Sequence, residues 1–166
     1  MPFPKMSCSI VCLLLLSFCS DVGRSNNPNP GMSKGTLEWQ ILVSETQCSI
    51  DKPRQMLIKS EEEFDKIWKE SQSGIEMGPA KPKVDFSKQW VIAGFLGWVK
   101  SSGYKLEIKS VETGSAATVI TLLQKRPGPG CMNAQVIEFP YFFASINHFS
   151  PETVQFKTVT EDVKCE

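Results

Sequence analysis

One pair of side chains has the residue types needed for nucleophilic catalysis, Cys131 and His148. A cysteine nucleophile needs a histidine within hydrogen-bond reach and a third group that orients the histidine. The sequence shows the two types seventeen positions apart with a predicted strand between them, and no orienting group is evident. We therefore interpret Cys131 as a loop or packing residue and His148 as a turn residue. A Cys131-dependent hydrolase is the weaker alternative.

The three glutamates that follow Ser60 are the other cluster that could do chemistry, as a cation site. Ser60 and Glu63 have the spacing of a capping box, and acidic residues are favoured in the first turn of a helix. We interpret the cluster as a helix start. The single histidine and the scattered cysteines lack zinc-ligand spacing, and hydrolase motifs are missing. The sequence thus predicts a protein that is not an enzyme, with no catalytic residue, cofactor or metal.

Charge is balanced, with 18 Lys and Arg against 18 Asp and Glu. Loss of residues 1–19 would remove one basic residue, Lys5, and leave a net charge of about −1. Nucleic-acid binding requires a clustered basic surface, so we do not expect this protein to bind nucleic acid.

The N-terminus has the pattern of an export signal. Lys5 precedes an apolar run over residues 9–18 that is too short for a permanent membrane span. Leu16-Ser17-Phe18-Cys19 is similar to the cleavage box of bacterial lipoproteins, which predicts lipidation at Cys19 and a place in the cell envelope, in the outer membrane or periplasm. Cleavage near Ser20 and secretion is the alternative. Residues 20–36 have the composition of a flexible tether.

Three cysteines remain in the folded part, and export permits a disulfide between two of them. Cys48 follows the first predicted strand and Cys165 follows the last one. We predict a disulfide between Cys48 and Cys165, although spacing alone leaves the connectivity open.

Residues 37–166 are predicted to form one mainly β (α+β) domain, in which antiparallel sheets make a small sandwich or open barrel with one helix packed on it. The helix begins after Ser60 and turns Phe64, Ile67 and Trp68 towards the sheet. Predicted strands cover residues 37–43, 55–59, 91–96, 104–111, 118–123, 135–143 and 154–157. The stretch 90–110 is interpreted as a hairpin from the centre of a sheet, and 135–143 as an edge or kinked strand because it contains Pro140.

Two loops, at residues 97–104 and 126–131, are rich in glycine, serine or proline and have no catalytic groups, and both are predicted to face a protein partner. Trp98 is either an exposed anchor or a packing residue. The candidate binding residues are Gly97, Trp98, Ser101, Ser102, Gly103, Tyr104, Pro127, Gly128, Pro129 and Gly130.

The order of these segments resembles the PrcB C-terminal domain family, the C-terminal part of an accessory lipoprotein subunit of a bacterial surface protease complex. The resemblance covers residues 37–159. Its motifs are the helix 64–68, Asp85-Phe86-Ser87, the strand 91–97, Gly103-Tyr104, Pro127-Gly128-Pro129-Gly130-Cys131, Gln135 and Pro140-Tyr141. Ser101-Ser102-Gly103-Tyr104 differs from the Thr-Gly-Gly-Tyr of the family.

The resemblance implies a non-enzymatic, exported protein that binds or stabilises a protease. A fainter likeness links the Gly103-Tyr104 loop to the Thr-Gly-Tyr loop of chagasin-type protease inhibitors. An inhibitor would block the protease that an accessory subunit supports, and the sequence leaves both roles open.

Overall fold

A computed structural model describes residues 35–164, which form eight strands and one helix. The predicted signal peptide, the Cys19 lipidation site and nearly all of the predicted tether lie outside the described residues. The elements are β1 (Gly35–Thr36), β2 (Trp39–Glu45), β3 (Arg54–Ile58), α1 (Glu61–Ser71), β4 (Gln89–Phe95), β5 (Lys105–Thr113), β6 (Thr118–Pro127), β7 (Tyr141–Asn147) and β8 (Val154–Val163).

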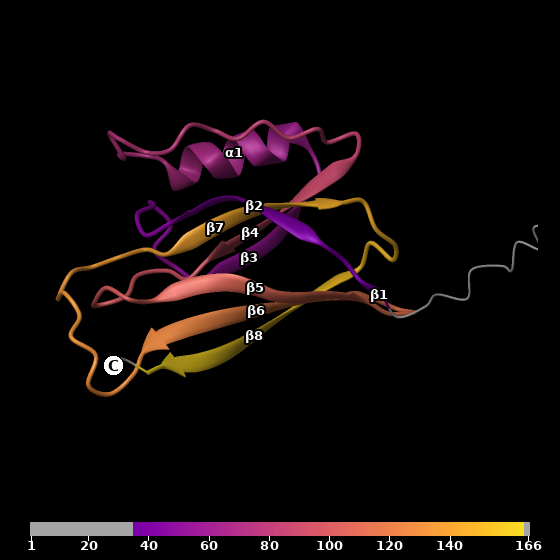
Figure 1. The fold of residues 1–166 in the computed structure, drawn as a ribbon. Coiled ribbons are helices and arrows are strands. Elements are labelled where there is room, and N and C mark those ends of the chain that lie inside the picture. Colours follow the sequence, from indigo (N-terminus) through magenta and orange to yellow (C-terminus); the bar gives the residue numbers. More distant parts are fainter. Residues whose placement is uncertain (1–34, 165–166) are drawn as a thin grey trace, which may run out of the picture.

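The strands form two four-stranded sheets, with the orders β1-β5-β6-β8 and β2-β7-β4-β3. All neighbouring strands are antiparallel except β6 and β8, which are parallel. Figure 1 shows three layers, with α1 above the β2-β7-β4-β3 sheet and the β1-β5-β6-β8 sheet below it. The predicted mainly β sandwich with one packed helix is confirmed.

Two cores lie on opposite faces of the β2-β7-β4-β3 sheet, because its central strands are buried on both sides. The odd-numbered residues of β4 and β7, such as Val91 and Phe143, pack against α1 in the helix-side core. The even-numbered residues, such as Ile92 and Phe142, pack against Ile120 and the rest of the other sheet in the inter-sheet core. Side chains alternate along a strand, so a strand covered on both faces needs a continuous apolar run.

The helix α1 begins as the sequence predicts. The Glu63 amide donates to Ser60 Oγ at 3.2 Å, which caps the first turn. The Glu63 carboxylate accepts from the Lys59 amide at 3.1 Å, one residue before the position of an ideal capping box. Phe64 and Trp68 are buried against the sheet, as predicted. In residues 35–164 no helix is long and apolar enough to cross a membrane.

The predicted hairpin over residues 90–110 is wrong, because β4 and β5 belong to different sheets. The amide of Leu96 donates to the Pro140 carbonyl at 2.9 Å, so the chain beyond β4 continues beside the 128–140 connection. It then passes to the other sheet before β5 starts. Alternation identifies a strand but carries no information about which sheet the strand joins.

Two further strand predictions are corrected. The segment before Pro140 is not a strand, and β7 starts after it as a central, buried strand between β2 and β4. In β2 the pairing register shifts between Ile41 and Val43, which leaves Ile41 45% exposed although simple alternation predicts it inside. Pro140 therefore marks the start of a strand, a position where its missing amide is tolerated.

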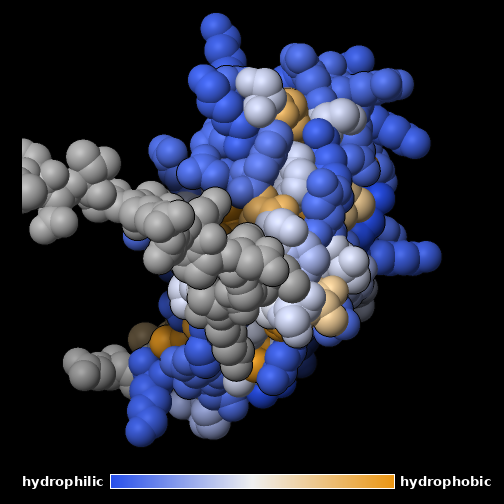
Figure 2. All heavy atoms as spheres, turned by 90° about the vertical axis from the view of Figure 1, so that its right-hand side faces the viewer, coloured by the Kyte–Doolittle hydropathy of each residue, from blue (hydrophilic) through white to orange (hydrophobic). Residues whose placement is uncertain are grey.

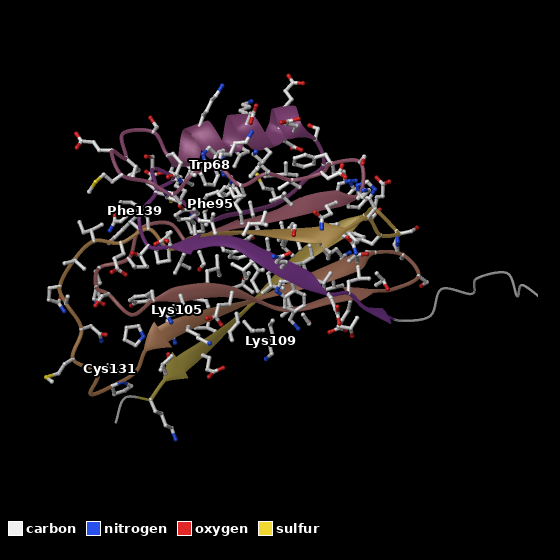
Figure 3. The ribbon with its side chains drawn as sticks, turned by 45° about the horizontal axis from the view of Figure 1, so that its top comes forward. Trp68, Phe95, Lys105, Lys109, Cys131 and Phe139 are labelled. Carbon is white, nitrogen blue, oxygen red and sulfur yellow. The ribbon has the colours of Figure 1, made fainter. Side chains whose placement is uncertain are left out.

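The predicted Cys48–Cys165 disulfide is wrong, because Cys48 is a free, buried cysteine. Its sulfur contacts the carbonyl oxygens of Ile50 and Phe139 beneath α1, and burial raises the pKa of this thiol. Cys131 is disulfide-bonded, and its partner lies outside the described residues. Figure 3 shows Cys131 in a loop far from Trp68, at the opposite side of the molecule from the helix.

Candidate partner-binding surface

The two loops singled out from the sequence meet at one end of the sandwich. We call residues 96–104, between β4 and β5, and residues 128–140, between β6 and β7, the two-loop surface. Val99 and Glu138 exchange backbone hydrogen bonds of 2.8 and 3.1 Å. Further along, the Ser102 amide donates to the Ala134 carbonyl at 3.0 Å, and the Ala134 amide donates to Ser102 Oγ at 3.0 Å. These bonds join the loops into a single unit.

Gly97 fixes the point where the first loop leaves the sheet. Its φ is +76°, and an added Cβ would lie 2.8 Å from the Asp51 carbonyl oxygen and 2.9 Å from Pro53 Cδ. Only glycine fits both the left-handed conformation and this close approach. The next amide, of Trp98, donates to the same Asp51 oxygen at 3.2 Å. The position of Trp98 is therefore set by the backbone, and its ring is left free to project.

The two-loop surface exposes large apolar side chains. Trp98 is 62% exposed, Ile137 62%, Val136 45%, and Met132 is fully exposed. The pairing of Val99 with Glu138 places Trp98 and Ile137 on the same side of this short ribbon, because side chains alternate along paired segments. Figure 2 shows the opposite end of the molecule, where the visible surface is mainly hydrophilic with separated apolar residues.

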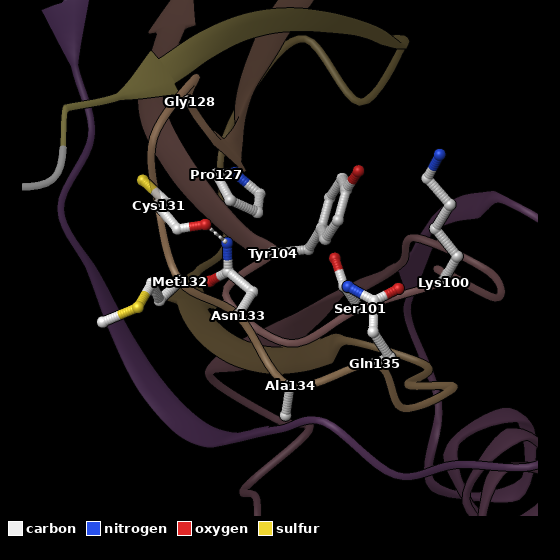
Figure 4. Close-up of a pocket in the computed structure, with 10 residues that line it drawn as sticks. All are labelled: Lys100, Ser101, Tyr104, Pro127, Gly128, Cys131, Met132, Asn133, Ala134 and Gln135. Atoms are coloured by element: carbon white, nitrogen blue, oxygen red, sulfur yellow. Dashed lines mark hydrogen bonds between the residues drawn. The ribbon is translucent and has the colours of Figure 1, made fainter.

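An open pocket of about 670 Å³ lies between the two loops. Figure 4 shows the Tyr104 ring standing inside it, with Pro127 and Cys131 on one side and Lys100 and Gln135 on the other. Lys100 is the one charged residue in this lining. Hydrogen-bonding groups beside exposed apolar side chains are suited to contact with a protein chain, because such interfaces combine an apolar centre with a polar rim.

The second loop is also attached to the end of β8. The Gly128 amide donates to the Val163 carbonyl at 3.0 Å, and the Cys131 sulfur lies 3.6 Å from the same oxygen. A Cβ on Gly128 would approach this oxygen to 2.5 Å. The disulfide at Cys131 adds a covalent restraint on this loop. These contacts hold the loop in one position, which lowers the ordering cost of binding.

The predicted binding residues divide into two groups. Trp98, Pro129 and Gly130 are exposed, and Tyr104 lines the pocket. The others shape the loops: Ser101 is buried, Gly97 and Gly128 lie against backbone, Ser102 bonds to the second loop, Gly103 has a φ of +92° and leaves no room for a Cβ beside Asn133, and Pro127 ends β6.

The sequence prediction missed the residues of the second loop that follow Cys131. They were placed partly in a strand, although Pro140 offered a signal that the strand begins later. The missed residues of this loop are Met132, Asn133, Ala134, Gln135, Val136 and Ile137, and Lys100 is the missed residue of the first loop.

Cys131 and His148 are not brought together. Cys131 lies in the loop that precedes β7, whereas His148 follows β7, so a strand of roughly 20 Å separates them. The His148 ring packs against Trp90 at 4.7 Å between ring centroids, and Cys131 is in a disulfide. Hence this pair forms no catalytic dyad. Within residues 35–164 no three His, Cys, Asp or Glu side chains are arranged to hold a metal ion.

The fold and this surface define a helix-covered β-sandwich that presents an apolar pair of loops at one end. Residues 90–147 match the family described as PrcB C-terminal, which confirms the resemblance seen in the sequence. The matched segment is narrower than the predicted 37–159, but it contains both loops and the central strands β4 and β7. Comparison with curated proteins and with solved structures found no match.

Proposed function

We propose that this protein is a non-enzymatic accessory subunit that binds and stabilises a secreted or surface protease through the two-loop surface. The carrying observation is that backbone hydrogen bonds join the two loops and place two exposed apolar side chains, Trp98 and Ile137, on the same side of the ribbon. Clustered exposed apolar side chains typically mark interaction sites, and tryptophan is enriched among residues that dominate binding energy.

The family match supports the choice of partner. The PrcB C-terminal family is associated with an accessory subunit of a protease complex, and the matched residues 90–147 include the whole two-loop surface. The two-loop surface suits a protease that presents an exposed apolar patch where it contacts this chain. The single charged residue in the pocket, Lys100, favours a partner whose contact region is largely uncharged.

Replacement of Trp98 by alanine is the direct test. A tagged wild-type chain should recover a protease from the native cell envelope. Because loss of a central tryptophan typically costs about 2 kcal/mol or more, Trp98→Ala should weaken binding about 30-fold or more. Binding is measured by titrating the recovered protease onto immobilised wild-type and variant chains.

Ile41→Ala is the matched control, because Ile41 is also an exposed apolar residue but lies on β2, outside the two-loop surface. It should bind like the wild type. Recovery of no protease, or equal binding by Trp98→Ala, would contradict the proposal. The protease activity of the complex separates the roles: a stabilising subunit maintains or prolongs it, whereas an inhibitor of the chagasin type abolishes it.

We also propose that the chain is held in the cell envelope by a lipid on Cys19. The sequence around Cys19 and the polar segment after it support this. Metabolic labelling with a palmitate analogue should modify the wild-type chain and not Cys19→Ala, with Cys12→Ala as a labelled control. A label that persists in Cys19→Ala would refute the site, and cleavage near Ser20 with release to the medium would then be favoured.

A further inference from the structure

The two sheets differ in how their edge strands are protected. The edge strand β3 has five residues, β1 has two, and β2 contains a register shift. The remaining edge strand, β8, has ten residues that pair with β6 in one unbroken parallel register. Short or irregular strands prevent pairing with other chains, whereas a long regular edge is a template for it. Among the edge strands in residues 35–164, β8 is thus the long and regular one, and its charged side chains decide what can pair with it.

The free side of β8 has unused hydrogen-bonding groups. Within the described part of the chain, the backbone of residues 154–162 pairs with β6 and with no other segment. Alternate residues of an edge strand point their amide and carbonyl groups away from the sheet. An antiparallel strand added at this edge can form hydrogen bonds only where outward-pointing residues of the two strands lie opposite each other. When two identical strands are related by a two-fold axis, this condition is met if the axis passes through a residue and not between two residues.

The charges along β8 select one such residue, Val159. An antiparallel pair centred on Val159 places Lys157 of each copy opposite Glu161 of the other, twice by symmetry. Moving the axis by one residue, to Thr158 or Thr160, separates Lys157 from Glu161 and places one of these two charges opposite Val159. The Val159 register keeps the charge pair, although it also places Asp162 opposite Phe156 nearer the ends of the strands. Neither Lys157 nor Glu161 has an ion-pair partner in residues 35–164. Both side chains are exposed; Glu161 lies beside Lys125 of β6, whose pKa its charge helps to raise after the larger contribution of Glu107.

The side chains around this axis are also compatible. Thr158 would lie opposite Thr160, a pair whose hydroxyl groups can hydrogen-bond across strands. Val159 lies beside Leu123 of β6 on the outer face of the sheet, and both are half-buried. Pairing at Val159 would extend this into a continuous apolar row across two copies. The register that pairs Lys157 with Glu161 therefore also brings Val159 of the two copies together.

We propose that β8 is a homodimerisation edge: two copies of this chain pair antiparallel about Val159 and form one continuous eight-stranded sheet from two β1-β5-β6-β8 sheets. This surface is formed by β8, whereas the proposed protease contact is formed by the 96–104 and 128–140 loops. The two proposals stand independently.

A charge-swap experiment on the full chain in mild detergent tests the pairing. Lys157→Glu places like charges opposite each other in both pairs, and so does Glu161→Lys. Each variant alone should dimerise about tenfold more weakly than the wild type, or worse, in sedimentation-velocity runs. An equimolar mixture should recover the wild-type affinity, because one chain then has acidic groups at both positions and the other has basic groups. Since mixing does not change a chain's internal contacts, the recovery is specific to pairing between chains.

Disulfide trapping tests the register. In Val159→Cys the two new thiols face each other, at a Cα separation of about 4.5–5.5 Å that a disulfide can bridge. Gln155→Cys is the matched control, since Gln155 lies on the same face of β8, but its two copies would be about 27 Å apart in this register. Mild oxidation should crosslink the first variant and not the second. A wild-type chain that stays monomeric up to about 100 μM would overturn the dimer. Equal crosslinking of both variants, or dimerisation unaffected by either charge change, would overturn the Val159 register.

Discussion

Phe143→Ala should lower the free energy of unfolding by about 3–5 kcal/mol, a large share of the total stability of a small domain. Phe143 is fully buried in β7, and its ring meets Phe64 and Trp68 of α1 at centroid distances of 5.5 and 5.3 Å. It also meets Phe95 and Tyr141 within the sheet, at 5.6 and 5.8 Å. Removing the ring leaves a cavity at the contact between helix and sheet, and urea unfolding measures the loss.

Ile137→Ala provides the comparison for this prediction. Ile137 is apolar as well but 62% exposed, so the same kind of truncation should change stability by no more than about 0.5 kcal/mol. A loss below about 1 kcal/mol for Phe143→Ala would show that α1 contributes little to the cooperative unit. The helix would then unfold separately from the sheets.

Gly97→Ala should destabilise the protein by about 2–4 kcal/mol and weaken partner binding as well. The φ of +76° is unfavourable for alanine, and the added methyl would overlap the Asp51 carbonyl and the Pro53 ring. The Asp51 oxygen belongs to the backbone and cannot rotate away. Relief of the overlap requires the 96–104 loop to move, which displaces Trp98. Thermal unfolding followed by circular dichroism, and the protease titration described above, measure the two effects.

Gly130→Ala separates the two causes of this loss. Gly130 has a similar φ of +88°, but no atom lies within 4 Å of the position of an added Cβ. This substitution should therefore cost only the conformational part, about 1–2 kcal/mol. If both substitutions cost the same amount, the close approach at Gly97 contributes nothing, and the backbone conformation alone explains the choice of glycine.

The features that depend on near neighbours in the chain were predictable from the sequence. Ser60 and Glu63 marked the helix start, because the capping bond joins residues three positions apart. Aspartate is a residue type typical of turns, and the Asp85 carboxylate accepts from the amide and hydroxyl of Ser87, two positions along the chain, at 3.1 and 2.6 Å. These bonds, led by that from the hydroxyl, lower the pKa of Asp85. The apolar run over residues 91–96 predicted a strand, and the structure confirms it as β4, which is buried on both faces.

The features that depend on distant parts of the chain were decided by the tertiary structure. An apolar run indicated β4 and alternation indicated β5, but their placement in different sheets depends on partners such as β7 and β6. Likewise, Cys48 and Cys131 are alike in sequence, yet one is buried as a thiol and the other is disulfide-bonded. Spacing does not determine such pairings, because they require two chain segments to meet in space.

The same division holds for the candidate site. Glycine and proline identified both loops, since those residues report backbone conformation locally. Nothing in the sequence indicates that Val99 pairs with Glu138, or that Ile137 thereby lies on the same exposed side as Trp98. Exposure is set by what packs over a residue, and here the loops cover each other's backbone while their apolar side chains stay outside. The sequence thus identifies the two loops, whereas the tertiary structure decides which of their side chains lie together on an exposed surface.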